Sequence, residues 1–261
     1  MKHLGVFILL LMVCHVYSHA QKKSAKTKVI AHRGAWKNTN LPQNSLGALN
    51  AAINMGCYAS ECDIWMTSDS VLVVNHDPHF YEMPIESTTY NELLGKKYPN
   101  GESIATLQQF LSVIIKQKGT RLVLDIKPSK ISKERSIVTA RKSYEMVVAN
   151  KAKKIVDYIL FDYDACLALK KLDGKANIAY LNGDKSPEEV ANDGLWGIDY
   201  SYKALQKNEA WIADAKRRKL TVNIWTVNDR ALAESYIRQD VEFLTTDEPE
   251  MLLKTVAEFG R

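Results

Sequence analysis

The stretch YASECDIWMTSDSVLVVNHD, residues 58–77, decides how this chain folds. Within it, Glu61 and Asp63 stand two residues apart in an apolar run that is typical of a β-strand. Because side chains on a strand alternate between its two faces, these carboxylates point the same way and Cys62 points the other way. Two acids on one face repel each other, so the spacing predicts a positive group between them, most simply a divalent cation.

The same stretch then turns back on itself. Thr67–Ser70 consists of good turn formers, and the apolar segment Val71–Val74 leads on to His76. A connection this short permits only an antiparallel partner. The hairpin therefore carries His76 back alongside Glu61 and Asp63, into what could be the same site. A surface hairpin with solvated charges is the alternative that this stretch alone leaves open.

Outward from the hairpin, apolar strand-like runs alternate with helical segments. Besides the strand of Glu61, the expected strands cover residues 28–31, 121–127, 156–161, 177–181, 197–202, 220–227 and 243–246. Helices are expected over residues 46–55, 107–118, 132–154, 162–172, 208–218 and 229–238, and from residues 186 and 250 onward. This alternation predicts a parallel sheet. About eight such units favour a single (β/α)8 TIM barrel over an open doubly wound sheet, because no G-x-G-x-x-G follows the first strand.

The composition is that of an ordinary soluble globular protein. The chain has 261 residues, of which 46% are hydrophobic and 25% charged, and its mean hydropathy is −0.24. The formal net charge of +5 is spread along the chain without a dense basic block. Such a charge suits an anionic small-molecule substrate and does not indicate nucleic acid.

The N-terminus is typical of a secretory signal peptide over residues 1–20. A short apolar run, Leu4–Val16, precedes the small-x-small site Ser18–Ala20, so we expect an exported mature protein, periplasmic or secreted, that starts near Gln21. The apolar run is too short to span a bilayer comfortably, and no later segment is long enough. A lipoprotein anchored at Cys14 is the less favoured alternative, because Val13 is bulkier than the small residue usual there.

A flexible lead-in is expected over residues 21–28, followed by one barrel domain over residues 29–261. Within that domain, Pro78–Ser103 has prolines, glycines and scattered aromatics but no clear period, which predicts an insertion at about residues 78–105, over one rim of the fold. The cysteines left after cleavage form no zinc-binding pattern. We expect them to be buried small hydrophobic residues without a disulfide. They are Cys57, Cys62 and Cys166.

In a barrel the carboxyl ends of the strands meet at one face, where such folds place their chemistry. Polar groups follow the first three barrel strands at this end. They are His32, Arg33, Glu61, Asp63, His76, Asp125 and Lys127. The three carboxylates are hard oxygen ligands suited to Ca²⁺ or Mg²⁺. The histidines suit acid–base catalysis, and the two cations suit a phosphate group. The alternative is a set of structural ion pairs between the acids and Arg33 or Lys127.

Seven short motifs follow one another along the chain. They are His32-Arg33-Gly34, Pro42-Gln43-Asn44-Ser45, Glu61-Cys62-Asp63, His76-Asp77, Asp125-Ile126-Lys127, Trp225-Thr226-Val227-Asn228 and Thr246-Asp247-Glu248-Pro249. Singly these motifs are weak, but in this order and spacing they are specific. Over essentially all of the mature chain, their order resembles that of the glycerophosphodiester phosphodiesterase family.

The resemblance implies a (β/α)8 barrel with a hairpin insertion, a divalent cation, and hydrolysis of glycerophosphodiesters to glycerol 3-phosphate and an alcohol. In the family mechanism the glycerol 2-hydroxyl attacks phosphorus and water opens the resulting cyclic phosphate. By similarity, the acid–base pair is His32 and His76, the metal ligands are Glu61, Asp63 and Asp125, and the phosphate contacts are Arg33 and Lys127. Substrate contacts are expected from Gln43, Asn44 and Trp225, although Asn44 or Ser45 could instead cap the next helix.

Two positions depart from the family pattern. Gln43 stands where the family most often has Glu, and Asp125 replaces a Glu that is one methylene longer. Both histidines are retained, so a metal-dependent hydrolase remains the favoured function. One alternative is a phospholipase D-like enzyme acting on lysolipids, for which the Pro78–Ser103 insertion could supply an apolar groove. The other is a binding protein that holds a phosphodiester without turnover.

Overall fold

Eight parallel strands close into a barrel in the computed structural model, which describes residues 27–259. Neighbours around the barrel follow the order β1-β2-β6-β7-β8-β9-β10-β11, and β1 pairs with both β2 and β11 to close it. The strands are β1 (Lys28–Ala31), β2 (Ala59–Met66), β6 (Arg121–Ile126), β7 (Val156–Leu160), β8 (Ile178–Tyr180), β9 (Gly197–Ser201), β10 (Thr221–Trp225) and β11 (Phe243–Thr246). The predicted (β/α)8 barrel is confirmed.

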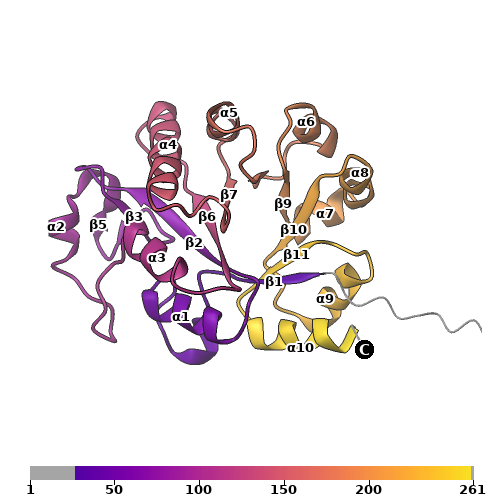
Figure 1. Ribbon diagram of the computed structural model, residues 1–261, viewed down its shortest axis with the longest axis horizontal. Helices are drawn as coiled ribbons and strands as arrows, with labels where there is room; N and C mark the ends of the chain where they lie inside the picture. The colour runs from indigo at the N-terminus through magenta and orange to yellow at the C-terminus, as the bar shows by residue number, and fades with distance from the viewer. Residues whose placement is uncertain (1–26, 260–261) are drawn as a thin grey trace, which may run out of the picture.

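Helices lie on the outside of the strands (Figure 1). They are α1 (Leu46–Asn54), α3 (Leu107–Ile114), α4 (Lys133–Ala149), α5 (Tyr163–Leu172), α6 (Pro187–Asn192), α7 (Tyr202–Lys207), α8 (Trp211–Arg217), α9 (Arg230–Ile237) and α10 (Pro249–Phe259), with a short 3-10 turn, η1 (Lys37–Thr39), after β1. Within residues 27–259, no helix combines the length and the apolar character that crossing a bilayer requires.

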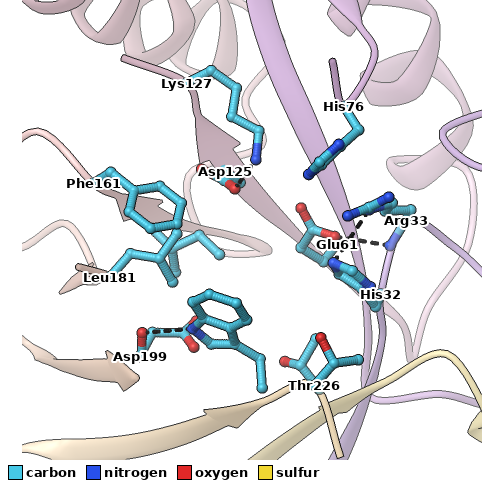
Figure 2. A pocket seen from close by; sticks show the side chains of 13 residues that line it. His32, Arg33, Glu61, His76, Asp125, Lys127, Phe161, Leu181, Asp199 and Thr226 are labelled. Carbon is cyan, nitrogen blue, oxygen red and sulfur yellow. Dashed lines mark hydrogen bonds and ion pairs between the residues drawn. The ribbon is translucent and has the colours of Figure 1, made fainter. Parts of the chain in front are cut away.

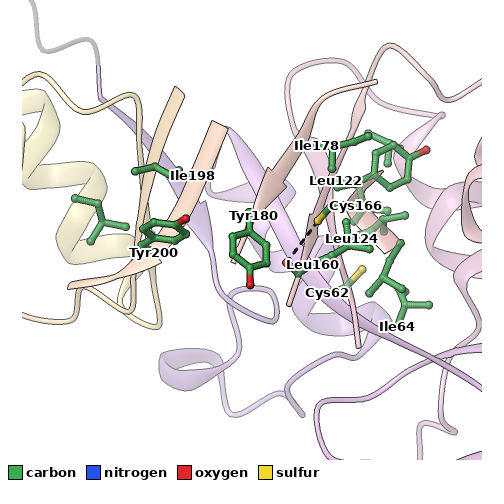
Figure 3. Close-up of a cluster of buried hydrophobic side chains, with 14 of the residues drawn as sticks. Cys62, Ile64, Leu122, Leu124, Leu160, Cys166, Ile178, Tyr180, Ile198 and Tyr200 are labelled. Carbon is green, nitrogen blue, oxygen red and sulfur yellow. Dashed lines mark hydrogen bonds between the residues drawn. The ribbon is translucent and has the colours of Figure 1, made fainter. Parts of the chain in front are cut away.

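Strand periodicity decides which side chains reach the barrel interior. On β6, Leu122 and Leu124 point outward into the large core between strands and helices, together with Cys62 and Ile64 of β2 (Figure 3). The residues between them, including Val123, point inward, where a smaller apolar cluster fills the barrel. Burial of the outward face thus turns Glu61, Asp63 and Asp125 into the barrel. The three cysteines between residues 27 and 259 are buried and free, as predicted.

The hairpin forms as the sequence predicts. Strand β3 (Leu72–Val74) runs antiparallel to β2, with Ile64 opposite Val74. The insertion that follows holds a two-stranded ribbon, β4 (His79–Phe80) and β5 (Met83–Pro84), then η2 (Ile85–Ser87) and α2 (Tyr90–Leu93). Trp65, Val73, Phe80, Ile85, Leu93 and Ile104 give this part a core of its own. The insertion therefore rests on the outer side of the hairpin, at one edge of the barrel (Figure 1).

Some predicted boundaries were wrong. The flexible lead-in was predicted to extend to residue 28, and this end is wrong. Thr27 is buried and donates a hydrogen bond to Val241 O at 2.7 Å, and Lys28 is the first residue of β1. The helix expected over residues 107–118 ends at Ile114, since the Gln117 side chain donates to Ile114 O at 3.1 Å and starts a turn. The predicted signal peptide and residues 21–26 lie outside the described residues.

Two further helices differ from expectation. The helix expected over residues 132–154 ends at Ala149, because Lys151 adopts φ 56°, a left-handed conformation that no α-helix continues. Helix α7 was missed and begins directly at the end of β9, where Ser201 caps it by accepting a hydrogen bond from Ala204 N. Neither difference involves a residue of the predicted site.

Candidate active site

Three acidic side chains meet on neighbouring strands inside the carboxyl end of the barrel. Asp63 of β2 and Asp125 of β6 are paired in register, and Glu61 lies one strand period before Asp63. Each of the three offers an oxygen within 4.8 Å of the others, and all are buried. Figure 2 shows Glu61 and Asp125 facing the pocket between the histidines and Lys127. The structure thus brings together the three predicted metal ligands.

Lys127 forms ion pairs with two of the three acids. Lys127 Nζ lies 2.6 Å from Asp63 Oδ1 and 2.6 Å from Asp125 Oδ2. Glu61 Oε2 accepts a hydrogen bond from Arg33 N at 2.8 Å. Glu61 Oε1 and Asp125 Oδ1 are buried and have no hydrogen-bond partner among residues 27–259. Part of the ion-pair alternative is therefore correct, but these contacts leave two acceptor oxygens of the group unsatisfied.

The shared environment pushes the carboxyl pKa values apart. Burial, with the neighbouring Asp63, raises the pKa of Glu61 well above its ordinary value, and burial raises that of Asp125 to about 7. Burial alone would raise the pKa of Asp63, but the charges of Lys127 and His76 and the hydrogen bonds from Lys127 and Asn44 together outweigh it, and the pKa of Asp63 is lowered. The three acids in turn raise the pKa of Lys127 despite its burial. More positive charge would let all three acids ionise.

A divalent cation fits this donor set. Glu61, Asp63 and Asp125 supply only carboxylate oxygens, the ligand type that Ca²⁺ and Mg²⁺ prefer. The unpartnered Oε1 of Glu61 and Oδ1 of Asp125 are free to act as ligands without breaking a hydrogen bond. Although Asp125 is shorter than the Glu usual at this position, it still contributes to the cluster. One of its carboxylate oxygens lies within 4.8 Å of an oxygen of Glu61 and of Asp63.

His32 follows the end of β1 and is held by a carboxylate from the other end of the chain. Its Nδ1 lies 2.7 Å from Asp247 Oδ1, and Asn228 Nδ2 donates to Asp247 Oδ2 at 2.7 Å. Burial alone would raise the pKa of Asp247, but the contact with His32 lowers it, so this carboxylate is ionised and only accepts. Nδ1 of His32 therefore carries a proton, and Nε2 keeps its lone pair, which faces Arg33 Nε at 3.3 Å.

His76 reaches the pocket from the loop after β3, as the hairpin predicted. Its Nδ1 lies 2.7 Å from Asp77 Oδ1. Burial lowers the pKa of His76, which the charge of Asp63 partly opposes and the charges of Lys127 and Arg33 reinforce. At neutral pH the ring is therefore mostly neutral. His32 and His76 line the same pocket.

Arg33 lies between the acids and the histidines. Its Nη1 donates to Gln43 Oε1 at 2.6 Å, and its Nε lies 3.7 Å from Asp63 Oδ2. Gln43 therefore orients the guanidinium through a neutral hydrogen bond, where a glutamate would form an ion pair. Asn44 is 1% exposed and donates from Nδ2 to Asp63 Oδ2 at 2.6 Å, so it lies beneath the pocket and fixes Asp63. Ser45, not Asn44, caps α1.

The pocket has a polar side and an apolar side and measures about 180 Å³. Figure 2 shows Phe161 and Leu181 opposite His32 and Glu61. Ile159 and Trp225 complete the apolar side, so Trp225 lines the pocket as expected. None of the lining residues comes from the insertion, and the apolar groove expected from Pro78–Ser103 is not part of this pocket.

Sequence reasoning missed several residues of the site. Asp247 stood in a quoted motif, but no role was assigned to it, and Asp77 was quoted only beside His76. Phe161 was placed at the end of an expected strand without a function. Asp199, buried on β9 and lining the same pocket, was not noticed at all. The alternation Ile198-Asp199-Tyr200, with apolar residues on either side of an acid in a strand, was the signal for it.

A family comparison decides the identity of the chain. The model of the glycerophosphoryl diester phosphodiesterase family matches residues 32–251, which include every strand end of the pocket. The chain belongs to this family. It is therefore an enzyme of the phosphoric diester hydrolases, and the resemblance of the motif order is confirmed.

Relatives of the phosphodiesterase extend over nearly the whole chain. A crystal structure of a glycerophosphodiester phosphodiesterase from Parabacteroides distasonis is 42% identical, covers 92% of this chain and 100% of its own, and has a TM-score of 0.88. The Caldanaerobacter subterraneus glycerophosphodiester phosphodiesterase is 27% identical over 90% of this chain and 100% of its own. A phosphodiesterase from Oleispira antarctica, solved with its product sn-glycerol-3-phosphate, is 24% identical, covers 88% of this chain and 96% of its own, and shares the fold with a TM-score of 0.74.

Proposed function

We propose that this phosphodiesterase hydrolyses glycerophosphodiesters to glycerol 3-phosphate and an alcohol, with a divalent cation held by Glu61, Asp63 and Asp125. One observation carries the proposal: three buried carboxylates lie together beside two histidines, and two of their oxygens have no hydrogen-bond partner among residues 27–259. The product named in the Oleispira antarctica structure agrees with this reaction. When bound, such a cation supplies charge stabilisation for the phosphoryl oxygens.

The two histidines act as the acid–base pair. One imidazole takes the proton from the glycerol 2-hydroxyl, whose oxygen then attacks phosphorus. The other histidine, protonated on both ring nitrogens as the imidazolium, gives the Nε2 proton to the oxygen of the leaving alcohol, so that the P–O bond breaks and a cyclic phosphate forms. Water opens this ring with the two roles reversed. The carboxylates of Asp247 and Asp77 keep the proton on Nδ1 of each ring, which directs Nε2 to the substrate.

Arg33 and Lys127 hold the phosphate. Arg33 Nη1 is oriented by Gln43 Oε1, and Lys127 Nζ is fixed between Asp63 and Asp125. Both cations line the pocket. They therefore stabilise the charge that builds on the equatorial oxygens of phosphorus in the transition state.

Phosphorus NMR tests the reaction. Metal-depleted protein is incubated with glycerophosphodiesters, with and without added Ca²⁺ or Mg²⁺. The proposal expects the signal of glycerol 3-phosphate only when a metal is present. A cyclic phosphate as the final product points to the phospholipase D-like alternative, in which water does not open the ring. Metal-dependent binding of diesters without any product would support the binding-protein alternative and reject the proposed function.

We also propose that the enzyme is exported, with cleavage near Gln21. The support is the sequence of residues 1–20 alone. Mass spectrometry of the protein purified from its native cells measures the N-terminal residue and its modification. A start near Gln21 agrees with a signal peptide, whereas a lipid-modified Cys14 would replace it with a membrane-anchored lipoprotein.

A further inference from the structure

A second polar row lies in the barrel interior, and two of its three members, Asp199 and Thr245, line the pocket. It consists of Asp199 on β9, Asn223 on β10 and Thr245 on β11. Asp199 and Asn223 are paired in register, so both side chains point into the barrel. Figure 2 shows Asp199 on the same side as Phe161 and Leu181, opposite Glu61 and His32. The row is therefore separate from the proposed metal site but faces the same cavity.

The hydrogen bonds of this row use all of its donors. Asn223 Nδ2 donates to Asp199 Oδ2 at 2.7 Å and to Thr245 Oγ1 at 2.9 Å. Thr245 Oγ1 donates to Asn223 Oδ1 at 3.1 Å. Asp199 Oδ1 alone is left over: it is buried and has no partner among residues 27–259. When Asp199 is ionised, the row offers an acceptor to a ligand and has no free donor for a phosphate oxygen, so the ligand must supply the donor.

The surroundings of this free oxygen favour a positively charged donor. Asp199 is 1% exposed and forms no ion pair with any residue between 27 and 259. Phe161 and Trp225 flank this side of the pocket, with ring centroids 6.1 Å apart and ring planes at 80°. Trp225 Nε1 donates to Asp199 O at 3.0 Å, which fixes the indole beside the acid. A buried carboxylate next to aromatic rings is a typical environment for an organic cation.

The charges of the proposed reaction leave Asp199 without a counterion. Lys127, Arg33 and a divalent cation together balance the three carboxylates of the triad and one phosphodiester. An additional buried carboxylate is costly unless the substrate brings a matching charge. Burial raises the pKa of Asp199 to about 7, with a smaller contribution from the charge of Asp125 and against a hydrogen bond from Asn223 that lowers it. An ammonium group at Oδ1 would keep this carboxylate ionised.

We propose that Asp199 recognises a protonated amine on the alcohol half of the substrate, so that the enzyme prefers glycerophosphodiesters of amino alcohols. The inference rests on the proposed function and names its substrate class. Glycerophosphoethanolamine has the required ammonium donor two carbons from the ester oxygen. Glycerophosphoglycerol is close to it in size but is neutral in its alcohol half.

Initial rates with these two diesters test the proposal. Wild-type enzyme, supplied with Ca²⁺ or Mg²⁺, is expected to show a kcat/KM for glycerophosphoethanolamine about tenfold or more above that for glycerophosphoglycerol. Removing one charge-assisted hydrogen bond typically changes affinity by about this factor. Asp199→Asn keeps the shape and the bond to Asn223, and it is expected to remove most of this preference, mainly through KM of the ethanolamine diester.

Asp157→Asn is the matched control. Asp157 is another buried acid of the barrel interior, but Arg121 binds both of its oxygens and it does not line the catalytic pocket. This variant is expected to keep the wild-type ratio between the two diesters. If Asp199→Asn does not fold, the wild-type ratio and an Asp199→Ser variant provide the test.

Two results would overturn the inference. One is a wild-type enzyme that hydrolyses both diesters with equal kcat/KM. The other is a variant at Asp199 that lowers kcat/KM equally for the two diesters. Asp199 would then act on the glycerol phosphate half that both substrates share. A wild-type enzyme that hydrolyses neither diester, with metal present, contradicts the proposed function itself. The two failures are therefore distinct.

Discussion

Buried acids at the two ends of the barrel differ in whether their oxygens have hydrogen-bond partners. Near the amino end of β7, Asp157 receives Arg121 Nε at 2.9 Å and Nη2 at 2.5 Å, and Asn177 Nδ2 at 2.8 Å. Both of its oxygens are satisfied. At the carboxyl end, Glu61 and Asp125 each keep a buried oxygen without a partner in the described part of the chain.

This difference indicates that the acid at the amino end contributes to stability and that the acids at the carboxyl end contribute to function. A buried carboxylate that is fully hydrogen-bonded and paired holds strands together without needing anything else. Buried acceptors that lack partners reduce the stability of the folded chain and are retained where a ligand completes them. In barrels of this kind the carboxyl end is the catalytic face and the amino end the stabilising one. Replacing acids at the two ends should therefore produce opposite phenotypes.

The largest expected effect is that of Glu61→Gln at the carboxyl end. Gln has the shape of a protonated glutamic acid but supplies one anionic metal ligand less. We expect kcat/KM to fall about a thousandfold, the upper range for losing one electrostatic contribution to a transition state. Because the pKa of Glu61 is raised well above its ordinary value, the melting temperature of metal-free protein should stay the same or rise. Initial rates and calorimetry in EDTA measure both. A rate near that of wild type would remove Glu61 from the proposed metal site.

The histidines come next. His32→Ala and His76→Ala should each lower kcat/KM by about a hundredfold or more, because each removes one partner of the proton transfer. Asp247→Asn keeps His32 but weakens control of its tautomer, so we expect a smaller loss of about tenfold. Steady-state kinetics with folded variants, checked by circular dichroism, gives the comparison. A histidine variant at the wild-type rate would mean that another group transfers that proton.

The opposite phenotype is expected at the amino end. Asp157→Asn breaks the ion pair between Asp157 and Arg121. The side chain of Asp157 is 4% exposed and that of Arg121 is 19% exposed. We expect the free energy of unfolding to fall by about 2 kcal/mol, below the usual loss for a fully buried pair since Arg121 keeps access to water. Activity of the folded variant should stay within about twofold, in line with its position outside the pocket. Urea unfolding together with initial rates measures this. A large loss of activity at unchanged stability would contradict the division between the two ends.

The smallest expected effect concerns pH. Burial lowers the pKa of His76 below its ordinary 6.5, because the imidazolium is the charged form and loses hydration. If His76 is the general base, its ring stays neutral and able to accept a proton below pH 6.5. The fall of kcat/KM at acid pH should therefore have its midpoint below pH 6.5. The hydrogen bond to Asp77 opposes the shift, so Asp77→Asn should move the limb further toward acid. If the acid limb of kcat/KM in Asp77→Asn moves toward alkaline pH instead, the titrating group is not His76.

Much of the fold and part of the site could be predicted from the sequence. Strand periodicity is local, so the spacing of Glu61 and Asp63 was enough to predict that both lie on one face of the strand, and the short turn was enough to predict that His76 returns beside them. The alternation of strands and helices predicted the eight-stranded barrel. Helix ends were less certain, because side chains such as Gln117 replace helical hydrogen bonds in ways that no periodicity records.

What could not be predicted depends on barrel closure. Asp247 contacts His32 across 215 positions, and only the pairing of β1 with β11 brings them together. Asp199 lies on a strand without a recognised motif, and its free oxygen is visible only once the partners of Asn223 and Thr245 are known. Such hydrogen-bond accounting requires the arrangement of three strands at once.

Calorimetric titration of Ca²⁺ and Mg²⁺ into chelator-treated protein tests the central claim most directly. The account predicts that wild-type protein and Asp157→Asn bind at least one of these ions at one site per chain, and that Glu61→Gln loses this binding or weakens it severely. Equal binding by all three proteins, or no binding by folded wild-type protein, would contradict the claim that the unpartnered carboxylates of the carboxyl end form the metal site.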